Sequence, residues 1–126
     1  MGDRSQVCIK DGESRVYLYA HWSGAQIYHD TAKALLRVPG RHDDSEYLAR
    51  AIFCEMIPKG EWAEETGFGI GTSQHGDVEH AIPVLDCSAG VVTFDKAGYH
   101  SADTPEGSMP FAEFAKRALA GEFDEL

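Results

Sequence analysis

The chain lacks a long hydrophobic run. None of its apolar stretches approaches the roughly 20 residues that a membrane helix needs, and the opening MGDRS has no apolar run behind a basic one, as a secretion signal would. The sequence therefore predicts a protein that stays in the cytoplasm and does not bind membranes. Its 126 residues, 43% of them hydrophobic, are typical of one globular domain. We expect that single α+β domain to cover residues 1–121 and an acidic tail, 122–126, to fray.

Basic residues are also scarce. The chain has 11 Lys and Arg against 21 Asp and Glu, for a net charge of −10. An anionic surface repels phosphate backbones and anionic lipids, so we expect no non-specific binding of nucleic acid or membranes. Such a charge suits docking onto a basic face of a partner protein, or imitation of nucleic acid, and it also keeps a small protein soluble.

Cysteine is limited to three residues, without a C-x-x-C pair. The odd number and this spacing argue against a disulfide framework and against a zinc knuckle. Cys8 and Cys54 lie inside the apolar runs QVCIK and AIFCEMI. We therefore expect buried, reduced thiols.

Two short motifs suggest cofactor chemistry but have the wrong geometry for it. GFGIG, residues 67–71, has the spacing G-x-G-x-G in place of the G-x-G-x-x-G of dinucleotide-binding loops, and it does not open a helix. HGDVEH, residues 75–80, gathers two histidines and two carboxylates, but Glu79 and His80 would point to opposite faces of a strand. We therefore predict neither a metal nor another cofactor. The alternating glycines of 67–71 indicate a strand that another element or a ligand approaches closely.

Periodicity predicts a mixture of strands and helices. The expected strands cover 6–10, 14–22, 67–73, 78–87 and 91–95, and the expected helices about 24–38, 45–57 and 109–120. Asp11-Gly12 is a typical hairpin turn, and Pro83, which has no N–H, places its strand at an edge or a bulge. The order ββααβββα, with strands joined by hairpins, predicts an α+β fold. We expect an antiparallel sheet of about five strands with helices packed mainly on one face.

Capping residues mark where the helices should begin. Ser23 and Gln26 fit a capping box at the first helix, and Asp43 and Glu46 fit a second one. Ser108 is expected to cap the third helix. The apolar spacing predicts that Leu48, Ala51, Ile52 and Met56 face inward on the second helix and that Leu119 is among the inward residues of the third.

The strand over 14–22 has two apolar or aromatic faces. One face carries Val16, Leu18, Ala20 and Trp22, and the other carries Arg15, Tyr17, Tyr19 and His21. We expect Trp22 to anchor the core on the first face. On the second face, aromatic rings two residues apart can stack on a base or fill a protein interface, and Arg15 adds a cation. The alternative is that a second layer of helices buries this face.

Known catalytic motifs are absent: the chain has neither a G-x-S-x-G elbow nor an S-x-x-K sequence. His21 or His29 could act as a base, with Cys54 or Ser23 as the nucleophile. The predicted helix cap already uses the Ser23 hydroxyl. A small hydrolase or transferase that depends on His21 or His29 is therefore the alternative to a binding protein.

Five segments of the chain resemble the sequence pattern of a known group of proteins. They are MGDRS, the KDGE hairpin, VYLYAHWSG before a helix, a helix containing YL, and TGFGIGT…GDVEHAIPVLD. Over residues 1–95 the chain resembles small proteins encoded by bacteriophages, including phages of actinobacteria. That family begins Met-Gly-Thr-Arg-Ser and carries His-Trp-Asp-Gly after a strand, whereas this chain has Asp3 and Ser23 in place of the threonine and the aspartate. Because serine and aspartate are both good helix caps, the second exchange favours a capping role over a catalytic carboxylate.

The resemblance implies a phage protein acting in the host cytoplasm, from a family without an established activity. Small non-structural phage proteins are often accessory factors. We therefore predict a binding protein, homodimeric or larger, that engages a host protein or sequesters a small nucleotide-like ligand, for example to counter host defence. A virion-associated structural protein is a further alternative, disfavoured because the sequence shows neither long helices nor β-rich repeats. The residues expected to bind the ligand or partner are Arg4, Arg15, Tyr17, Tyr19, His21 and Trp22.

Overall fold

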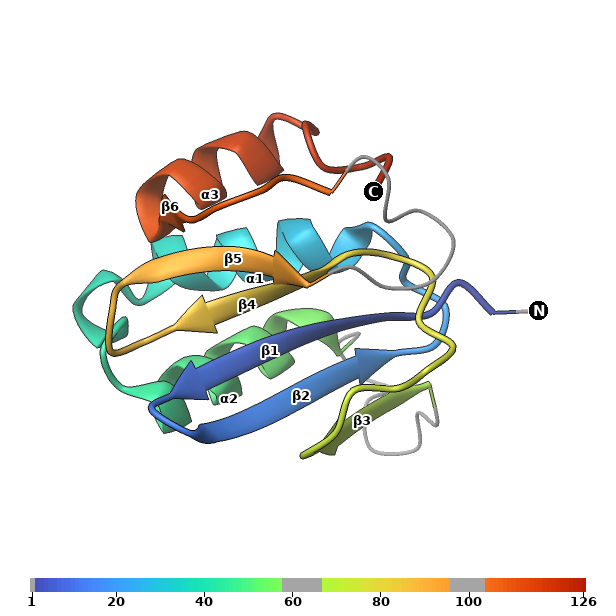
Figure 1. Ribbon diagram of the computed structural model, residues 1–126, viewed down its shortest axis with the longest axis horizontal. Coiled ribbons are helices and arrows are strands. Elements are labelled where there is room, and N and C mark those ends of the chain that lie inside the picture. Colours follow the sequence, from blue (N-terminus) through green and yellow to red (C-terminus); the bar gives the residue numbers. More distant parts are fainter. Residues whose placement is uncertain (1, 58–66, 96–103) are drawn as a thin grey trace.

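The computed structural model describes residues 2–57, 67–95 and 104–126 (Figure 1). In this part of the chain the strands form a six-stranded sheet in the order β3-β2-β1-β4-β5-β6. The strands are β1 (Ser5–Asp11), β2 (Ser14–Ala20), β3 (Phe68–Gly71), β4 (Ile82–Asp86), β5 (Val91–Asp95) and β6 (Met109–Pro110). The helices are α1 (Gln26–Arg37), α2 (Ser45–Met56) and α3 (Phe111–Leu119), with a short 3-10 helix, η1 (Pro39–Arg41), between α1 and α2. The predicted α+β class is confirmed.

The sheet is mixed because β1 and β4 run parallel. The other neighbouring strands pair antiparallel, and two of these pairs, β1–β2 and β4–β5, are the expected hairpins. The chain leaves β2, passes through α1 and α2, and returns by way of β3 before β4 joins the other side of β1. A connection of that length does not impose an antiparallel direction as a tight turn does. The expectation of an antiparallel sheet of five strands is therefore correct only in part, and it also omits β6.

Pro83 lies inside the sheet and not at its edge. Its strand, β4, is flanked by β1 and β5. The ladder from β4 to β1 begins at Val84, one residue after Pro83, so the missing N–H falls outside that paired stretch. The expected edge position is wrong, because a central strand tolerates proline where its ladder to one neighbour, here β1, has not yet begun.

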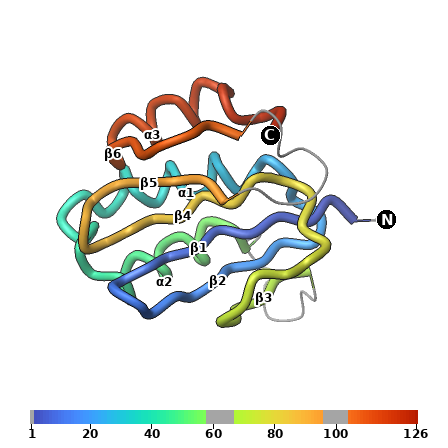
Figure 2. The backbone as a smooth tube through the Cα atoms, viewed as in Figure 1, coloured from blue at the N-terminus to red at the C-terminus, as the bar shows by residue number. Residues whose placement is uncertain are grey.

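The helices cover one face of the sheet (Figures 1 and 2), as predicted. The main core lies between the helices and this face of the sheet. It includes Val7, Ile9, Leu18, Leu85 and Val92 from the strands and Ile27, Leu35, Leu48, Ile52 and Phe114 from the helices. The helices α1 and α2 run antiparallel, which their short connection predicts (Figure 1). The inward residues expected for α2 are all buried, namely Leu48, Ala51, Ile52 and Met56. Leu119 of α3, also expected to face inward, is exposed.

The first helix begins later than the sequence pattern suggests. Ala25 is its N-cap, and no side chain caps it. The Ser23 carbonyl accepts from the Gln26 backbone N–H at 3.0 Å, and the Gln26 side chain donates to Asp30 within the helix at 3.2 Å. The expected capping box is wrong, because Gly24, with a left-handed φ of 54°, inserts a bend between Ser23 and the helix.

The other two helices also begin differently from expectation. The carboxylate of Asp44, one residue after the expected Asp43, caps α2 by accepting from the Tyr47 N–H at 3.1 Å. Pro110 is the N-cap of α3, which has no side-chain cap, so Ser108 does not act there. Both differences follow from where the preceding turn or strand ends, which local composition does not specify.

The C-terminal segment, residues 122–126, packs against the domain. Phe123 is 1% exposed, and its ring stacks on that of Phe114 with centroids 5.5 Å apart. Leu126 is also buried. Gly121, with a φ of 82°, turns the chain back after α3. The expected fraying is wrong, because this turn places the one aromatic residue of an acidic segment over the core.

The opposite face of the sheet carries a smaller buried cluster of Cys8, Tyr17, Val78, Ile82 and Val84. All three cysteines are free thiols, and Cys8 and Cys87 are buried. Burial raises the pKa of the Cys8 thiol, and it raises that of Cys87 to about 11. Cys54 is exposed on α2, which corrects the expectation for it: an apolar run on a helix still places some of its positions toward solvent.

Candidate functional site

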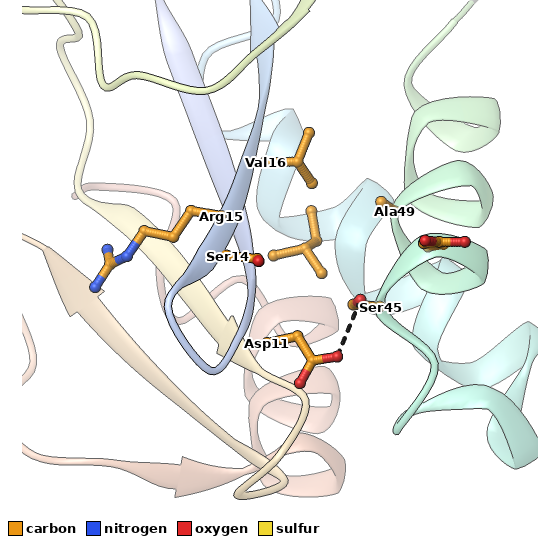
Figure 3. A pocket seen from close by; sticks show the side chains of 8 residues that line it. Asp11, Ser14, Arg15, Val16, Ser45 and Ala49 are labelled. Atoms are coloured by element: carbon orange, nitrogen blue, oxygen red, sulfur yellow. Dashed lines mark hydrogen bonds between the residues drawn. The ribbon is translucent and has the colours of Figure 1, made fainter.

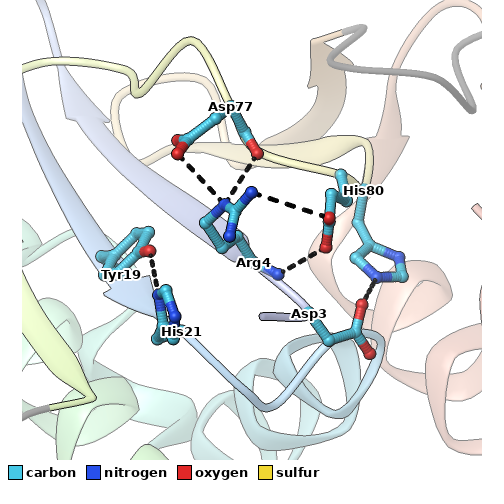
Figure 4. Close-up of polar contacts among 7 residues, drawn as sticks. Asp3, Arg4, Tyr19, His21, Asp77 and His80 are labelled. Carbon is cyan, nitrogen blue, oxygen red and sulfur yellow. Dashed lines mark hydrogen bonds and ion pairs between the residues drawn. The ribbon is translucent and has the colours of Figure 1, made fainter. Parts of the chain in front are cut away.

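Four of the six expected binding residues lie at one end of the sheet. Arg4 precedes β1, Tyr19 lies near the end of β2, and His21 and Trp22 follow β2. The pairing of β1 with β2 joins these segments, and the Asp3 N–H donates to the His21 carbonyl at 2.7 Å. Figure 4 shows Arg4, Tyr19 and His21 beside the acidic segment that follows β3. We call the group of Arg4, Tyr19, His21 and Trp22 the aromatic end.

Arg4 is held by two carboxylates. Its Nε lies 3.1 Å from Oδ2 of Asp77, and its Nη2 lies 3.9 Å from Oε1 of Glu79. The Glu79 carboxylate also accepts from the Arg4 backbone N–H at 2.9 Å. The charge of Arg4 is therefore compensated within the protein, and this arginine does not present a bare cation to a ligand.

Tyr19 and His21 form a hydrogen-bonded pair, with 2.8 Å between the Tyr19 hydroxyl and Nδ1 of the imidazole (Figure 4). Burial raises the pKa of Tyr19, and the negative charge of Asp77 raises it further. The phenol therefore stays protonated at neutral pH. The Tyr19 ring also lies against the His75 ring, with centroids 4.7 Å apart. These contacts orient the His21 ring and leave Nε2 as its second polar atom.

Trp22 is exposed on one side and closely packed on the other. It is 56% exposed, and its ring meets the His21 ring edge-on, with centroids 4.7 Å apart. A Cβ added to Gly67 would lie 2.3 Å from Cζ3 of the indole. This is the close approach that the alternating glycines of 67–71 indicate. The expected core position of Trp22 is wrong, because β2 ends at Ala20 and the chain turns before the indole.

Arg15 and Tyr17 lie farther along β2, away from the aromatic end. Tyr17 is only 6% exposed and packs in the buried cluster on the sheet face opposite the helices. Arg15 is exposed, 3.9 Å from the carboxylate of Asp95 and 3.5 Å from the Tyr17 hydroxyl. The aromatic face of β2 therefore divides: Tyr17 is structural, whereas Tyr19 and His21 are half-buried.

Residues 72–81 cover part of this face. The Gln6 side chain on β1 accepts from the His75 N–H at 2.9 Å and donates to the Ser73 carbonyl at 3.3 Å. Val78 enters the buried cluster that contains Tyr17. A second layer therefore buries Tyr17, but it is an irregular segment and not the helices that the alternative interpretation expected, and it leaves Tyr19 and His21 only half-buried.

His29, the second candidate base, is engaged elsewhere. Its Nε2 lies 2.8 Å from Oδ1 of Asp124, which links α1 to the C-terminal segment. His80 has a similar role, with Nε2 2.6 Å from Oδ1 of Asp3 (Figure 4) and Nδ1 2.5 Å from the Leu126 oxygen. Across residues 2–57, 67–95 and 104–126, no group of three or more His, Cys, Asp or Glu side chains is arranged to hold a metal ion.

Five further residues contact the aromatic end, and the sequence did not indicate them. These are Asp3, Gly67, His75, Asp77 and Glu79. Four of them lie in the GFGIG and HGDVEH motifs, so the only signal in the sequence was that glycines, histidines and carboxylates are concentrated there. The sequence could not show what these residues contact, because the partner of Asp77 is Arg4, 73 residues away.

No family model matches the chain, and neither a curated protein nor a solved structure matches it. Within the described residues, no helix has the length and apolar character needed to cross a membrane. The fold and the aromatic end together define an α+β domain with an exposed tryptophan that is supported by Gly67 and His21.

Proposed function

We propose that the protein is an accessory binding protein that docks onto a partner protein through the aromatic end. The resemblance to phage proteins suggests a host protein as the partner, in the host cytoplasm, for example to counter host defence. The observation that carries the proposal is Trp22, which is 56% exposed yet held between Gly67 and His21. An indole that is already fixed loses little conformational freedom on binding, and tryptophan is enriched among the residues that dominate interfaces.

Charge favours a partner with basic residues around its contact. The side chains of Asp3 and Asp77, beside the aromatic end, are 56% and 63% exposed, and the chain carries a net charge of −10. Opposite charges at the rim of an interface accelerate association and exclude wrong partners. Sequestration of a small nucleotide-like ligand has less support, because a phosphate would compete for Arg4 with carboxylates that already bind it.

A hydrolase or transferase that depends on His21 is the second candidate. The 2.8 Å hydrogen bond between the Tyr19 hydroxyl and His21 favours it, because an oriented imidazole can exchange a proton with a substrate through its other nitrogen. His29 has less support as a base, since Asp124 occupies its Nε2. A homodimer or higher oligomer remains part of the proposal, and a virion-associated structural role has no specific observation in its favour.

Trp22→Ala and Leu36→Ala form a matched pair for testing the aromatic end. Leu36 is a 60% exposed apolar residue on α1, outside the aromatic end. Both variants and the wild type are used as bait in the lysate of the cell that makes the protein, and partners are quantified by mass spectrometry. We expect a partner that wild type and Leu36→Ala retain and that Trp22→Ala loses. The affinity of the purified partner should fall at least about 30-fold, as for a binding hot spot of about 2 kcal/mol.

Other outcomes distinguish the alternatives. A partner bound equally by Trp22→Ala would contradict docking through the aromatic end. Native mass spectrometry reports the oligomer and any retained small molecule, and a retained nucleotide would favour sequestration. Turnover of a nucleotide panel that His21→Ala abolishes and Trp22→Ala preserves would favour the enzyme.

A further inference from the structure

A groove runs along α2 on the helix side of the sheet. One cavity of about 400 Å³ lies between α2 and the strands β1 and β2, another of about 270 Å³ lies between α2 and the strands β2 and β3, and both are lined by Val16, Glu46 and Ala49. A third cavity, of about 420 Å³, shares Asp11, Ser45 and Glu46 with the first. Their shared walls join the three cavities into one continuous feature, which we call the α2 groove.

The end of the α2 groove near the β1–β2 turn is acidic. Its carboxylates are Asp11, Asp43, Asp44 and Glu46. One cation lines the same cavity, Arg41, and its guanidinium lies over the Tyr47 ring, 5.0 Å from the centroid. Arg15 borders the neighbouring cavity, but Figure 3 shows its side chain pointing away from α2. This end therefore carries an excess of negative charge.

The other end of the α2 groove is apolar. Its walls are mainly Val16, Leu18, Ala49, Phe53 and Ile70, and the two charged residues that also line it, Glu46 and Arg50, have opposite charges. Ile70 is 64% exposed, and it lies on β3, the outermost strand of the sheet on that side. It pairs with Leu18, a core residue, so it projects to the helix side of the sheet, where it lines the same cavity as Phe53. A large apolar side chain therefore stands in solvent beside an apolar cavity.

From this succession of acidic and apolar walls we propose that the α2 groove binds a short segment of a partner protein with Lys or Arg at one end and apolar side chains at the other. The cations pair with the carboxylates around Asp11 and Glu46, and the apolar side chains cover Ile70 and fill the cavity beside Phe53. A second copy of this chain is a weaker occupant, because each copy carries a net charge of −10. The α2 groove is separate from the aromatic end, and the proposal does not depend on Trp22.

A display selection tests the proposal on the complete chain. A library of random short peptides is selected on the wild-type protein, and the enriched peptides are synthesised with a fluorescent label and titrated. We expect peptides with basic residues at one end and apolar residues at the other. Amide shifts in ¹⁵N spectra on binding should concentrate at Glu46, Ala49 and Ile70.

Matched variants locate the binding. Ile70→Asp is compared with Leu36→Asp, which adds the same charge at another exposed apolar position, 60% exposed. Asp43→Asn with Glu46→Gln is compared with Glu113→Gln and Glu125→Gln, two exposed carboxylates outside the groove. We expect Ile70→Asp to weaken peptide binding at least about tenfold, and the Asp43–Glu46 double variant to weaken it about three- to tenfold with a smaller salt dependence. Both controls should stay within about twofold of wild type.

Three results would overturn the proposal. The first is that selection enriches no peptide, or enriches acidic ones. The second is that the selected peptides bind Ile70→Asp as well as they bind Leu36→Asp. The third is a dimer in native mass spectrometry that Ile70→Asp dissociates while no peptide binds, which would assign the α2 groove to a second copy of the chain.

Discussion

The two faces of the sheet are made by alternate residues of the same strands, yet they are covered in different ways. The helices α1, α2 and α3 cover one face, and their apolar spacing is visible in the sequence (Figure 1). On the other face, the irregular residues 72–81 lie over Tyr17, attached through Gln6 and Arg4. A strand with two apolar faces therefore predicts that other parts of the chain pack on both sides of it. Only helices or strands that do so leave a periodic pattern in the sequence by which they can be found.

The largest effect is expected on the helix-covered face. Phe114→Ala removes a fully buried ring that packs against Phe94 and Phe123. We expect the free energy of unfolding to fall by about 3–5 kcal/mol, measured by urea denaturation, because a large cavity replaces the ring. Leu119→Ala, on the exposed side of the same helix, should cost no more than about 1 kcal/mol. Equal losses for the two variants would show that the core does not extend to α3 as described.

A smaller effect is expected where the sheet meets the aromatic end. Gly67→Ala would place a Cβ 2.3 Å from the Trp22 ring, so the indole must move. We expect a loss of about 1–3 kcal/mol in the free energy of unfolding. In a Trp62→Phe background, the emission of Trp22 should also shift to longer wavelength. The control is Gly76→Ala, because a Cβ at Gly76 meets nothing within 4 Å. An unchanged emission spectrum in Gly67→Ala would contradict the packing of Trp22.

On the opposite face, Gln6→Leu should loosen residues 72–81, which cover that face of the sheet. This substitution keeps the side-chain volume but leaves the His75 N–H and the Ser73 carbonyl without their partner on β1. We expect a loss of about 1–2 kcal/mol, together with faster hydrogen exchange of the His75 amide. Gln74→Leu, at an exposed position in the same segment, is the control. Slow exchange at His75 in Gln6→Leu would mean that other contacts hold residues 72–81.

The reactivity of the three thiols compares the two faces of the sheet in the wild-type protein. Cys87 belongs to the core on the helix side, Cys8 lies on the opposite face, and Cys54 is exposed. In a disulfide-exchange assay at pH 8, Cys54 should react first. A pKa of about 11 keeps Cys87 protonated at that pH. Raising the pH toward 11 increases its thiolate fraction, but burial still limits access. Gln6→Leu should increase the disulfide-exchange rate of Cys8 alone. An equal increase for Cys87 would show that both faces of the sheet become accessible in the same opening event.

Features that depend on residues close together in the sequence were predictable, whereas features that depend on distant segments were not. The helix expected over 45–57 is observed as Ser45–Met56, and the Asp11-Gly12 turn forms, with Gly12 at φ 63°. Both depend on residues within one or two turns of chain. The parallel β1–β4 pair and the burial of Phe123 were not predictable in this way. Each depends on which distant segment lies alongside, and a long connection leaves no periodic trace of that choice.

For the aromatic end, alternation along β2 correctly placed Tyr19 and His21 on one face, since side-chain direction along a strand is a local property. It could not show that Tyr17 is buried while Tyr19 is only partly covered, because the cover comes from residues 72–81. It also could not show that Arg4 is neutralised by Asp77.

The sequence by itself determined the α+β class, the two hairpins and the inward face of α2, because periodicity and turn chemistry act over a few residues. Only the tertiary structure decided that Trp22 rests on Gly67 and that the α2 groove joins Asp11 to Ile70. Strand order brings these residues together across long stretches of chain. Local pattern determines the direction in which a side chain points, whereas packing of the whole domain determines what it meets there.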